Sequence, residues 1–205
     1  MEGADQSEFG RTWYSRVTTL PPARASLTVT GPAYAGKTAL IAGLAQATST
    51  SAVEAGDIVH LVDAGPIDGE ERHLAGIVAN AATTDGVLFV VDQDLRAPEV
   101  AAIERLMTTG KPLYVVLNKA DQFNASDRDA ILVSIRNKMP KGFAAGDVVS
   151  VAVAPSPIER EVEDARGAVR VELRRPSADL RALTNLLSRI FPPSAGRKLR
   201  FEAAA

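Results

Sequence analysis

The stretch GPAYAGKT, residues 31–38, decides the fold of this chain, because it joins an alternating apolar run, ASLTVT, to an Ala- and Leu-rich run, ALIAGLAQA. Two glycines with four residues between them, followed by Lys37 and Thr38, are typical of a strand–loop–helix whose backbone amides surround phosphate. The glycines let the backbone approach a β-phosphate, Lys37 neutralises the β- and γ-phosphate charge, and the Thr38 hydroxyl can ligate Mg²⁺. The stretch therefore predicts a nucleotide-binding loop between a strand and a helix.

From Ala25 onward the chain alternates β-rich runs with helical patterns. Runs such as GVLFVV and PLYVVL are apolar on both faces, which suits parallel strands buried under helices. Strands that alternate with helices predict a doubly wound, mostly parallel α/β sheet with helices on both faces. The expected strands are 26–31, 57–63, 85–92, 112–118 and 146–153, and the expected helices are 37–47, 69–81, 97–109 and 126–139, the last one capped by Ser126.

Two segments flank the single domain that is predicted at 25–191. Residues 1–24 are mostly polar, with Trp13 and Tyr14 among them, and predict an N-terminal arm. Residues 192–205 predict a tail, or the start of a segment that continues past Ala205.

Residues 158–175 interrupt the alternation and predict an extra surface hairpin. The run AVRVELRR predicts a half-exposed strand with Val169, Val171 and Leu173 on one face, after a turn at Arg166-Gly167. The run SADLRALTNLLSRIF then predicts a closing amphipathic helix capped by Ser177.

The bulk composition indicates an ordinary globular domain of 205 residues, 46% hydrophobic and 23% charged. A formal net charge of −2 gives no indication of a nucleic-acid partner. The absence of cysteine excludes disulfides and cysteine metal sites. With no long apolar run and no signal-peptide layout, we expect a cytoplasmic protein, reaching the inner face of a membrane only through a region beyond the given chain.

Two further stretches bring the residue types that nucleotide chemistry needs. In LVDAGPID, residues 61–68, Asp63 ends an apolar strand that is expected beside the phosphate loop, where a carboxylate can hold Mg²⁺ through a water. In VVLNKAD, Asn118 and Asp121 follow a buried strand, at the end where α/β sheets bind ligands. Taken alone, an Asp or Asn after a strand also reads as a simple turn.

The NKAD segment favours guanine over adenine. A carboxylate such as that of Asp121 accepts hydrogen bonds from both N1–H and the 2-amino group of guanine, and adenine has neither donor. The Asn118 amide is expected to meet the opposite edge of the base, and the Lys119 stem is expected to cover its face.

These three stretches, in this order, resemble the Era-like division of the TRAFAC class of P-loop GTPases, over about residues 26–191. The resemblance implies GTP or GDP as ligand, Mg²⁺ as cofactor, slow hydrolysis and a change of shape between the two nucleotide states. It implies nucleotide contacts from Gly31, Ala33, Tyr34, Ala35, Gly36, Lys37, Thr38, Gly65, Asn118, Lys119, Asp121 and Ala154 (with Ala152 as the alternative to Ala154), and metal contacts from Thr38 and Asp63. The run FVVDQDLRAPEVAAIERLMTTGKPLYVVLNKAD is also similar to bacterial GTPase domains that precede a membrane-associated C-terminal region.

The chain departs from the family pattern in its switch segments. The family's glycine that gives its N–H to the γ-phosphate is replaced by Pro66, which has no N–H, so Gly65 is the expected substitute. Only residues 39–62 separate Thr38 from Asp63, so switch I and the family's antiparallel edge strand are expected to be shortened or absent. The candidates for the switch hydroxyl are Thr48, Ser49, Thr50 and Ser51.

No obvious catalytic residue follows, because Ile67 stands where many small GTPases carry a glutamine. His73 is a candidate, as are Glu70 and Glu71, although a helical residue of this kind usually faces solvent. Tyr34 is expected to cover the nucleotide, meet a partner or pack on switch I.

The sequence therefore predicts a guanine-nucleotide-binding switch and slow GTP hydrolase that needs a protein partner or a second copy for hydrolysis. One alternative is a degenerate GTPase-fold scaffold with weak or no hydrolysis. The other is an ATP-using P-loop enzyme such as a kinase, which Asn118 and Asp121 argue against.

Overall fold

The computed structural model describes residues 24–49, 56–140, 143–163, 169–194 and 197–204. Of the predicted N-terminal arm, only Arg24 is described, and it begins the first strand of the sheet. Residues 50 and 51, two candidates for the switch hydroxyl, and the predicted turn at 166–167 lie outside the described residues.

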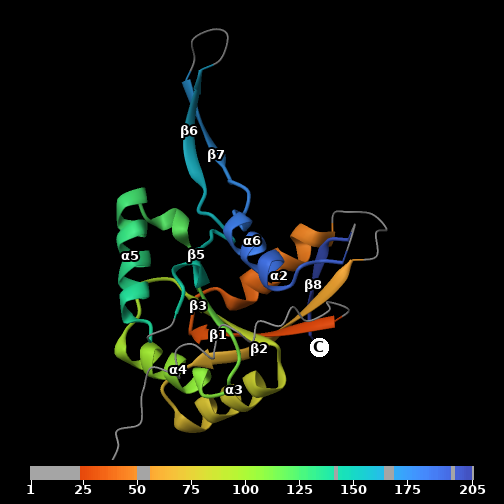
Figure 1. The fold of residues 1–205 in the computed structure, drawn as a ribbon. Helices are drawn as coiled ribbons and strands as arrows, with labels where there is room; N and C mark the ends of the chain where they lie inside the picture. Colours follow the sequence, from red (N-terminus) through yellow and green to blue (C-terminus); the bar gives the residue numbers. More distant parts are fainter. Residues whose placement is uncertain (1–23, 50–55, 141–142, 164–168, 195–196, 205) are drawn as a thin grey trace, which may run out of the picture.

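Six parallel strands form one sheet in the order β5-β4-β3-β1-β2-β8 (Figure 1). They are β1 Arg24–Pro32, β2 Asp57–Ile67, β3 Gly86–Val91, β4 Leu113–Leu117, β5 Val148–Ser150 and β8 Leu199–Ala203. The chain runs from β1 to β2 on one side of β1 and then returns to β3 on its other side. This reversal is a topological switch point, and ligands of open α/β sheets bind beyond the carboxyl ends of the strands at such a point.

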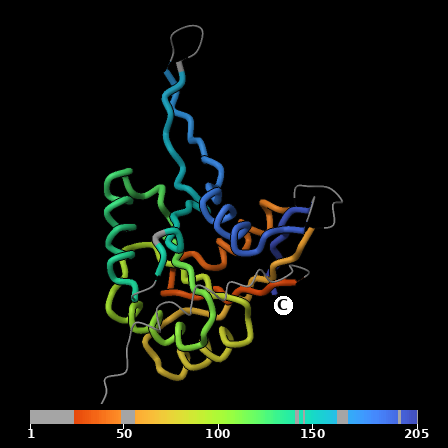
Figure 2. Tube along the Cα trace, in the orientation of Figure 1, coloured from red at the N-terminus to blue at the C-terminus, as the bar shows by residue number. Residues whose placement is uncertain are grey.

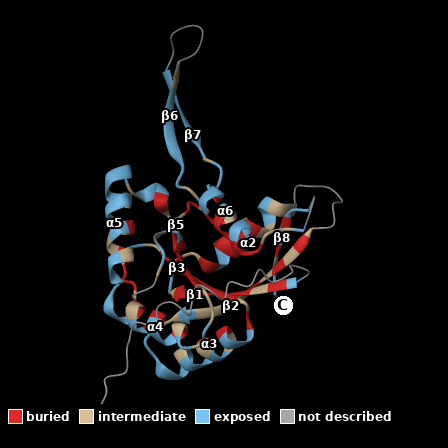
Figure 3. Cartoon of the chain, viewed as in Figure 1, coloured by how far each residue is buried: buried red, intermediate tan, exposed pale blue. Residues whose placement is uncertain are grey.

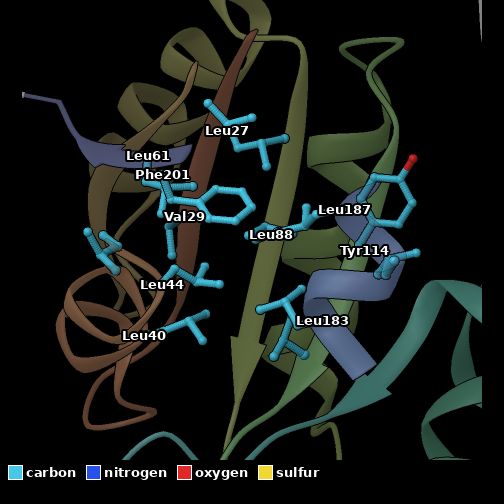
Figure 4. Packing of buried hydrophobic residues seen from close by; sticks show 14 of the residues in the cluster. Leu27, Val29, Leu40, Leu44, Leu61, Leu88, Tyr114, Leu183, Leu187 and Phe201 are labelled. Carbon is cyan, nitrogen blue, oxygen red and sulfur yellow. The ribbon is translucent and has the colours of Figure 1, made fainter. Parts of the chain in front are cut away.

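Helices cover both faces of the sheet, so the predicted doubly wound α/β fold is confirmed. On one face lie α2 (Lys37–Ser49) and α6 (Arg181–Ile190), and on the other lie α3 (Glu71–Thr83), α4 (Ala97–Met107) and α5 (Ala125–Lys138). Strand side chains alternate between these two cores: Leu88 of β3 lies in the core under α2 and α6, whereas Phe89 lies in the other. Figure 4 shows Leu44 of α2 and Leu187 of α6 in the first of these cores, on the same side of the sheet as Leu88 of β3.

The edge beside β2 is formed by β8, where the sequence predicts only a tail. Leu199 and Phe201 are buried there, and the Phe201 N–H donates to Thr48 Oγ1 of α2 at 3.2 Å. The preceding segment is fixed by the buried Asp57 carboxylate, which accepts from the Ser194 N–H at 2.5 Å and from Arg197 Nη1 at 3.4 Å. The strand beside β2 in the described structure is thus a parallel one from the last part of the chain, where the sequence predicts a tail.

A separate two-stranded antiparallel sheet confirms the predicted hairpin: β6 (Ile158–Glu163) pairs with β7 (Val169–Arg174). Figure 2 shows it projecting away from the rest of the molecule. The expectation of a half-exposed strand was wrong, because every β7 residue is exposed (Figure 3). No other described element covers either face of this ribbon.

Two predicted helix caps were wrong. The N-cap of α5 is Asn124, whose side chain accepts from the Asp127 N–H at 2.9 Å, and Ser126 lies inside the helix. The last helix begins only at Arg181, whose N–H donates to Asp179 Oδ1 at 3.3 Å, because Asp179 is held by a β-bridge to Ala152. Asn124 lies two residues before Ser126, whereas the N-cap position of α6 is Leu180, three residues after Ser177, and has no side-chain capping hydrogen bond.

The predicted strand 146–153 is reduced to β5, because Ala145–Asp147 form a 3-10 turn before it. In the described part of the chain, no helix has the length and apolarity needed to cross a membrane.

Candidate nucleotide-binding site

The phosphate-loop stretch has the predicted strand–loop–helix form, between the end of β1 and the start of α2. Three of its residues have positive φ: Gly31 at 141°, Tyr34 at 65° and Gly36 at 87°. A Cβ on Gly31 would lie 2.0 Å from the Val90 carbonyl oxygen of β3, so only glycine fits there. Tyr34 is the one residue of these three that is not a glycine, and a bulky side chain in the left-handed region is strained. Its side chain is in solvent, since Tyr34 is 90% exposed.

Lys37 folds back over the loop. Its Nζ donates to the Gly31 carbonyl oxygen at 3.2 Å and to the Pro32 carbonyl oxygen at 2.8 Å. The side chain is only 8% exposed, and burial lowers the pKa of the ammonium while the charge of Asp63 acts in the opposite direction. A partly desolvated cation at the start of a helix is suited to an anionic ligand, since phosphate would supply the missing counter-charge.

Thr38 and Asp63, the two predicted metal ligands, lie in contact with each other. Thr38 Oγ1 donates to Asp63 Oδ2 at 3.3 Å, and both residues are exposed to solvent. A hydroxyl and a carboxylate fit Mg²⁺, which takes few protein ligands and fills its shell with water and phosphate oxygens. Among the residues that the structure describes, no group of three or more His, Cys, Asp or Glu could cage a metal without such help.

The segment after Asp63 does not leave the sheet but continues it. Pro66 is paired with Gly31 and Ile67 with Pro32, after a register shift that leaves Gly65 in a bulge with φ 85°. The Gly65 N–H, the expected γ-phosphate donor, donates instead to Asp63 Oδ1 at 3.0 Å. Its carbonyl oxygen accepts from Thr30 Oγ1 at 3.1 Å.

Asn118 joins the phosphate loop to the loops at the other end of the site. Its Nδ2 donates to the Ala35 carbonyl oxygen at 3.0 Å, and its Oδ1 accepts from the Val153 N–H at 3.3 Å. Gly36 has to be a glycine next to it, because a Cβ there would lie 2.3 Å from Asn118 Nδ2. With 2% exposure, Asn118 therefore positions two loops, which differs from the free edge that we expected it to present to a base.

Asp121 and Lys119 stand at the surface beside Asn118. Asp121 is exposed, and its Oδ2 accepts from the Ser156 N–H at 2.9 Å. Lys119 has a left-handed backbone, φ 57°, and its Nζ donates to Asp92 Oδ2 at 2.7 Å. Within the described residues, no protein group donates to the other carboxylate oxygen of Asp121.

Ala154 lies between the two backbone amides that bind Asn118 and Asp121, those of Val153 and Ser156. The alternative, Ala152, is buried and bridged in both directions to Asp179. The structure thus brings Ala154, and not Ala152, to the exposed loop around Asp121.

Of the remaining candidates, Thr48 is placed wrongly for a metal. It lies ten residues along α2 from Thr38, about 15 Å at the helical rise, and its hydroxyl is used by the contact to Phe201. The side chain of Ser49, another candidate for the switch hydroxyl, lies outside the described part of the structure.

His73 is engaged by carboxylates of its own segment. Its Nδ1 lies 2.5 Å from Asp68 Oδ2 and its Nε2 lies 3.8 Å from Glu70 Oε2. The hydrogen bond to Asp68 raises the pKa of the exposed imidazole. Glu71 pairs with Arg105 of α4 at 3.1 Å. None of these contacts directs the three candidates toward the phosphate loop.

Sequence reasoning missed Asp92, Ser156 and Thr30. Asp92 had a usable signal, since it directly follows the apolar run GVLFVV at the carboxyl end of a strand. Ser156 acts through its backbone and Thr30 through a contact to a distant loop, so neither carries a signal in its residue type.

No protein-family model and no curated protein matches the chain. Among solved structures it is similar to a probable GTP-binding protein engB, at 16% identity over 63% of this chain and 89% of that one, with a TM-score of 0.47. It is similar to translation elongation factor SelB from Methanococcus maripaludis at 20% identity over 65% and 30%, with a TM-score of 0.49. It is similar to SsGBP in a complex with GDP at 20% identity over 66% and 46%, also with a TM-score of 0.49.

By their descriptions, the first of these neighbours is a probable GTP-binding protein and SsGBP is in a complex with GDP. The chain spans less than two thirds of SelB and of SsGBP. Identities and TM-scores this low carry no information on the activity of this chain. What the chain binds has to be argued from its own residues.

Proposed function

We propose that this protein binds guanine nucleotide with Mg²⁺ and hydrolyses GTP slowly, as a P-loop GTPase of the Era-like kind. The single observation that carries the proposal is the pair of hydrogen bonds of Asn118, which join the phosphate loop at Ala35 to the loop at Val153. A phosphate-binding element and a base-selecting carboxylate are thereby held on one edge of the sheet, at the topological switch point.

Each part of a nucleoside diphosphate has a counterpart among these residues. The amides of the loop before α2 and the Lys37 ammonium suit the phosphates. The exposed Asp121 suits the N1–H and 2-amino donors of guanine, and the amide of Ala154 suits the guanine carbonyl oxygen. Thr38 and Asp63 would hold Mg²⁺, which supplies charge neutralisation at the β- and γ-phosphates when it is bound.

Slow hydrolysis follows from what surrounds the γ-phosphate position. Ile67 has no group that could orient water, and the three acidic and imidazole candidates of the 68–73 segment are bonded to one another or to α4. A protein partner or a second copy is therefore proposed to complete the reaction.

Calorimetric titration of GDP, GTP and ATP, each with and without Mg²⁺, tests the proposal. We expect GDP and GTP to bind, ATP to bind at least tenfold more weakly, and Mg²⁺ to strengthen GTP binding. A preference for ATP would assign the site to an ATP-using enzyme instead.

A second candidate function, a GTPase-fold scaffold with little or no hydrolysis, is favoured by one observation. The amide that should reach a γ-phosphate belongs to Gly65 and is bonded to Asp63, and its neighbour Pro66 has no N–H. Phosphate release measured from GTP at micromolar protein separates the two candidates: the scaffold gives bound nucleotide with no turnover, whereas the GTPase gives a slow rate that Lys37→Met abolishes.

A further inference from the structure

The β6–β7 hairpin exposes a row of aliphatic side chains on its outer strand. Val169, Val171 and Leu173, here called the aliphatic row, are 61%, 60% and 68% exposed and share one face of β7. The other face of β7 carries the charged row, Arg170, Glu172 and Arg174. Of the six large hydrophobic side chains recorded as exposed in the described part of the chain, four lie on this hairpin, so the apolar exposure is concentrated there.

The free side of β7 is also an open edge. Within the described residues β7 pairs only with β6, and the register from Ile158 to Glu163 runs without a bulge. Natural edge strands are usually protected by charged side chains, lysine above all, by proline, by a bulge or by a covering element. In the described structure, β7 has no lysine, proline, bulge or covering element, and its charged side chains all lie on one face and alternate in sign. Figure 3 shows β7 as exposed.

We propose that this edge pairs antiparallel with the same edge of a second copy of the chain, with Val171 opposite Val171 of the second copy. Such a pairing is two-fold symmetric, so each contact occurs twice. The pairing converts two hairpins into one four-stranded sheet and covers the open β7 edge of each copy.

The charge pattern of β7 selects this register. With Val171 on the axis, Arg170 lies opposite Glu172 of the second copy, and Glu172 lies opposite Arg170 of the second copy. On the other face Val169 lies opposite Leu173 of the second copy, so the aliphatic row meets itself. Cross-strand pairs of opposite charge and of β-branched or aliphatic residues both stabilise a sheet.

Other arrangements place like charges together or separate the aliphatic rows. With Glu172 on the axis, each Glu172 faces the other and Arg170 faces Arg174 of the second copy. With Leu173 on the axis, Val171 faces Arg175 of the second copy. Pairing through β6 instead sets Glu159 and Glu161 against glutamates, which is destabilising.

Within the monomer, Arg170 Nη2 lies 2.7 Å from Glu172 Oε1, and both side chains are exposed, by 69% and 49% respectively. The two charges are therefore already held on one face of β7, in position for exchange with the second copy.

A pair of charge variants tests the proposal by sedimentation equilibrium. The wild type is expected to dimerise with rising concentration. Arg170→Glu and Glu172→Arg should each weaken the dimer at least tenfold, because each puts two like-charged pairs across the axis. An equimolar mixture of the two variants should restore association, because every Glu then faces an Arg of the other chain, although the pair within each chain stays broken. A wild type that remains monomeric, or variants that dimerise like it, would overturn the proposal.

Single-cysteine cross-linking tests the register, since the chain contains no cysteine of its own. Val171→Cys should form an intermolecular disulfide under mild oxidation, because residues opposite each other across an antiparallel pair have Cα atoms about 4.5–5.5 Å apart. Leu173→Cys, which faces Val169, should cross-link at least tenfold more slowly, and Val133→Cys on α5 gives the background for an exposed site. Faster cross-linking of Leu173→Cys would refute the register, and faster cross-linking of Glu161→Cys would place the interface on β6.

Discussion

Replacing Asp121 by Asn tests whether the NKAD loop chooses the base. The substitution keeps the shape of the side chain and keeps an oxygen that can accept from the Ser156 N–H, now at 2.9 Å from Oδ2. Because Asp121 is exposed and this hydrogen bond survives, the free energy of unfolding should change by no more than about 0.5 kcal/mol. Any loss of nucleotide affinity is then a property of the site and not of the fold.

The expected loss follows from the charge of the acceptor. A hydrogen bond to a charged group contributes about 1.5–3 kcal/mol. Replacing the carboxylate by an amide also places the second guanine donor opposite an NH₂ group, which cannot accept a hydrogen bond from it. GDP affinity should therefore fall about 10- to 150-fold. Xanthine carries a 2-carbonyl where guanine carries the 2-amino group, so the same amide should strengthen XDP binding.

Calorimetry with GDP and XDP on the wild type and the variant measures both effects. Asp129→Asn is the matched control, because it makes the same change at an exposed aspartate of α5, 3.9 Å from Arg128 Nε. If Asp121→Asn keeps the wild-type preference for GDP over XDP, the NKAD segment is only a turn and the guanine assignment fails.

Three further substitutions test the phosphate loop and the sheet edge. Lys37→Met keeps the buried stem and removes the charge, so the protein should stay folded while GDP affinity, measured by calorimetry, falls at least tenfold through the loss of charged hydrogen bonds of about 1.5–3 kcal/mol; unchanged affinity would contradict the phosphate-loop assignment. Gly36→Ala should cost about 2–4 kcal/mol in urea unfolding, from a left-handed backbone and the displaced Asn118 amide, whereas Gly76→Ala in α3, where a Cβ meets nothing within 4 Å, should not destabilise. Asp57→Asn should lower the melting temperature at pH 7, because hydrogen bonds led by the Ser194 N–H lower the pKa of this carboxyl group. A carboxyl group with a lowered pKa in the folded state stabilises the fold above its unfolded pKa, and this stabilisation is lost as the pH falls through the folded pKa. The difference in melting temperature from the wild type should therefore close below about pH 4.

The sequence was sufficient for the parts of the fold that local patterns determine. The phosphate loop, the apolar strands β3 and β4 and the helices between them follow from residue types and spacing within short windows. The hairpin was predicted from its alternation for the same reason, although exposure of both its faces was not, because burial depends on what packs against a strand.

β8 was not predictable in this way. LRFEA is a short strand pattern whose partner, Asp57–Leu61, lies far away in the chain, and a parallel pairing leaves no turn between the two segments to indicate it. Its attachment depends on tertiary contacts alone, those of Asp57 and Thr48. The role of Asn118 escaped for a similar reason: residue type predicts that an amide forms hydrogen bonds, but only the fold determines that both of its ends meet backbone groups.

The hydrogen bond from the Gly65 N–H to Asp63 joins the expected γ-phosphate donor to the expected metal-site carboxylate. Within the described residues, β8 pairs with β2 as far as Leu61, opposite Ala203, and no strand pairs with Pro66 on that side, so Pro66 lies at an edge, where a proline is tolerated in a sheet. The expected γ-phosphate donor is then the amide of Gly65, and it is bonded to Asp63 Oδ1, while Asp63 Oδ2 accepts from Thr38. A γ-phosphate can receive the Gly65 N–H only if Asp63 releases it, and the released carboxylate oxygen is the one that becomes available to a metal-bound water. In the proposed state with Mg²⁺ and GTP bound, metal binding and recognition of the third phosphate would both compete with this internal contact, so each would favour the other.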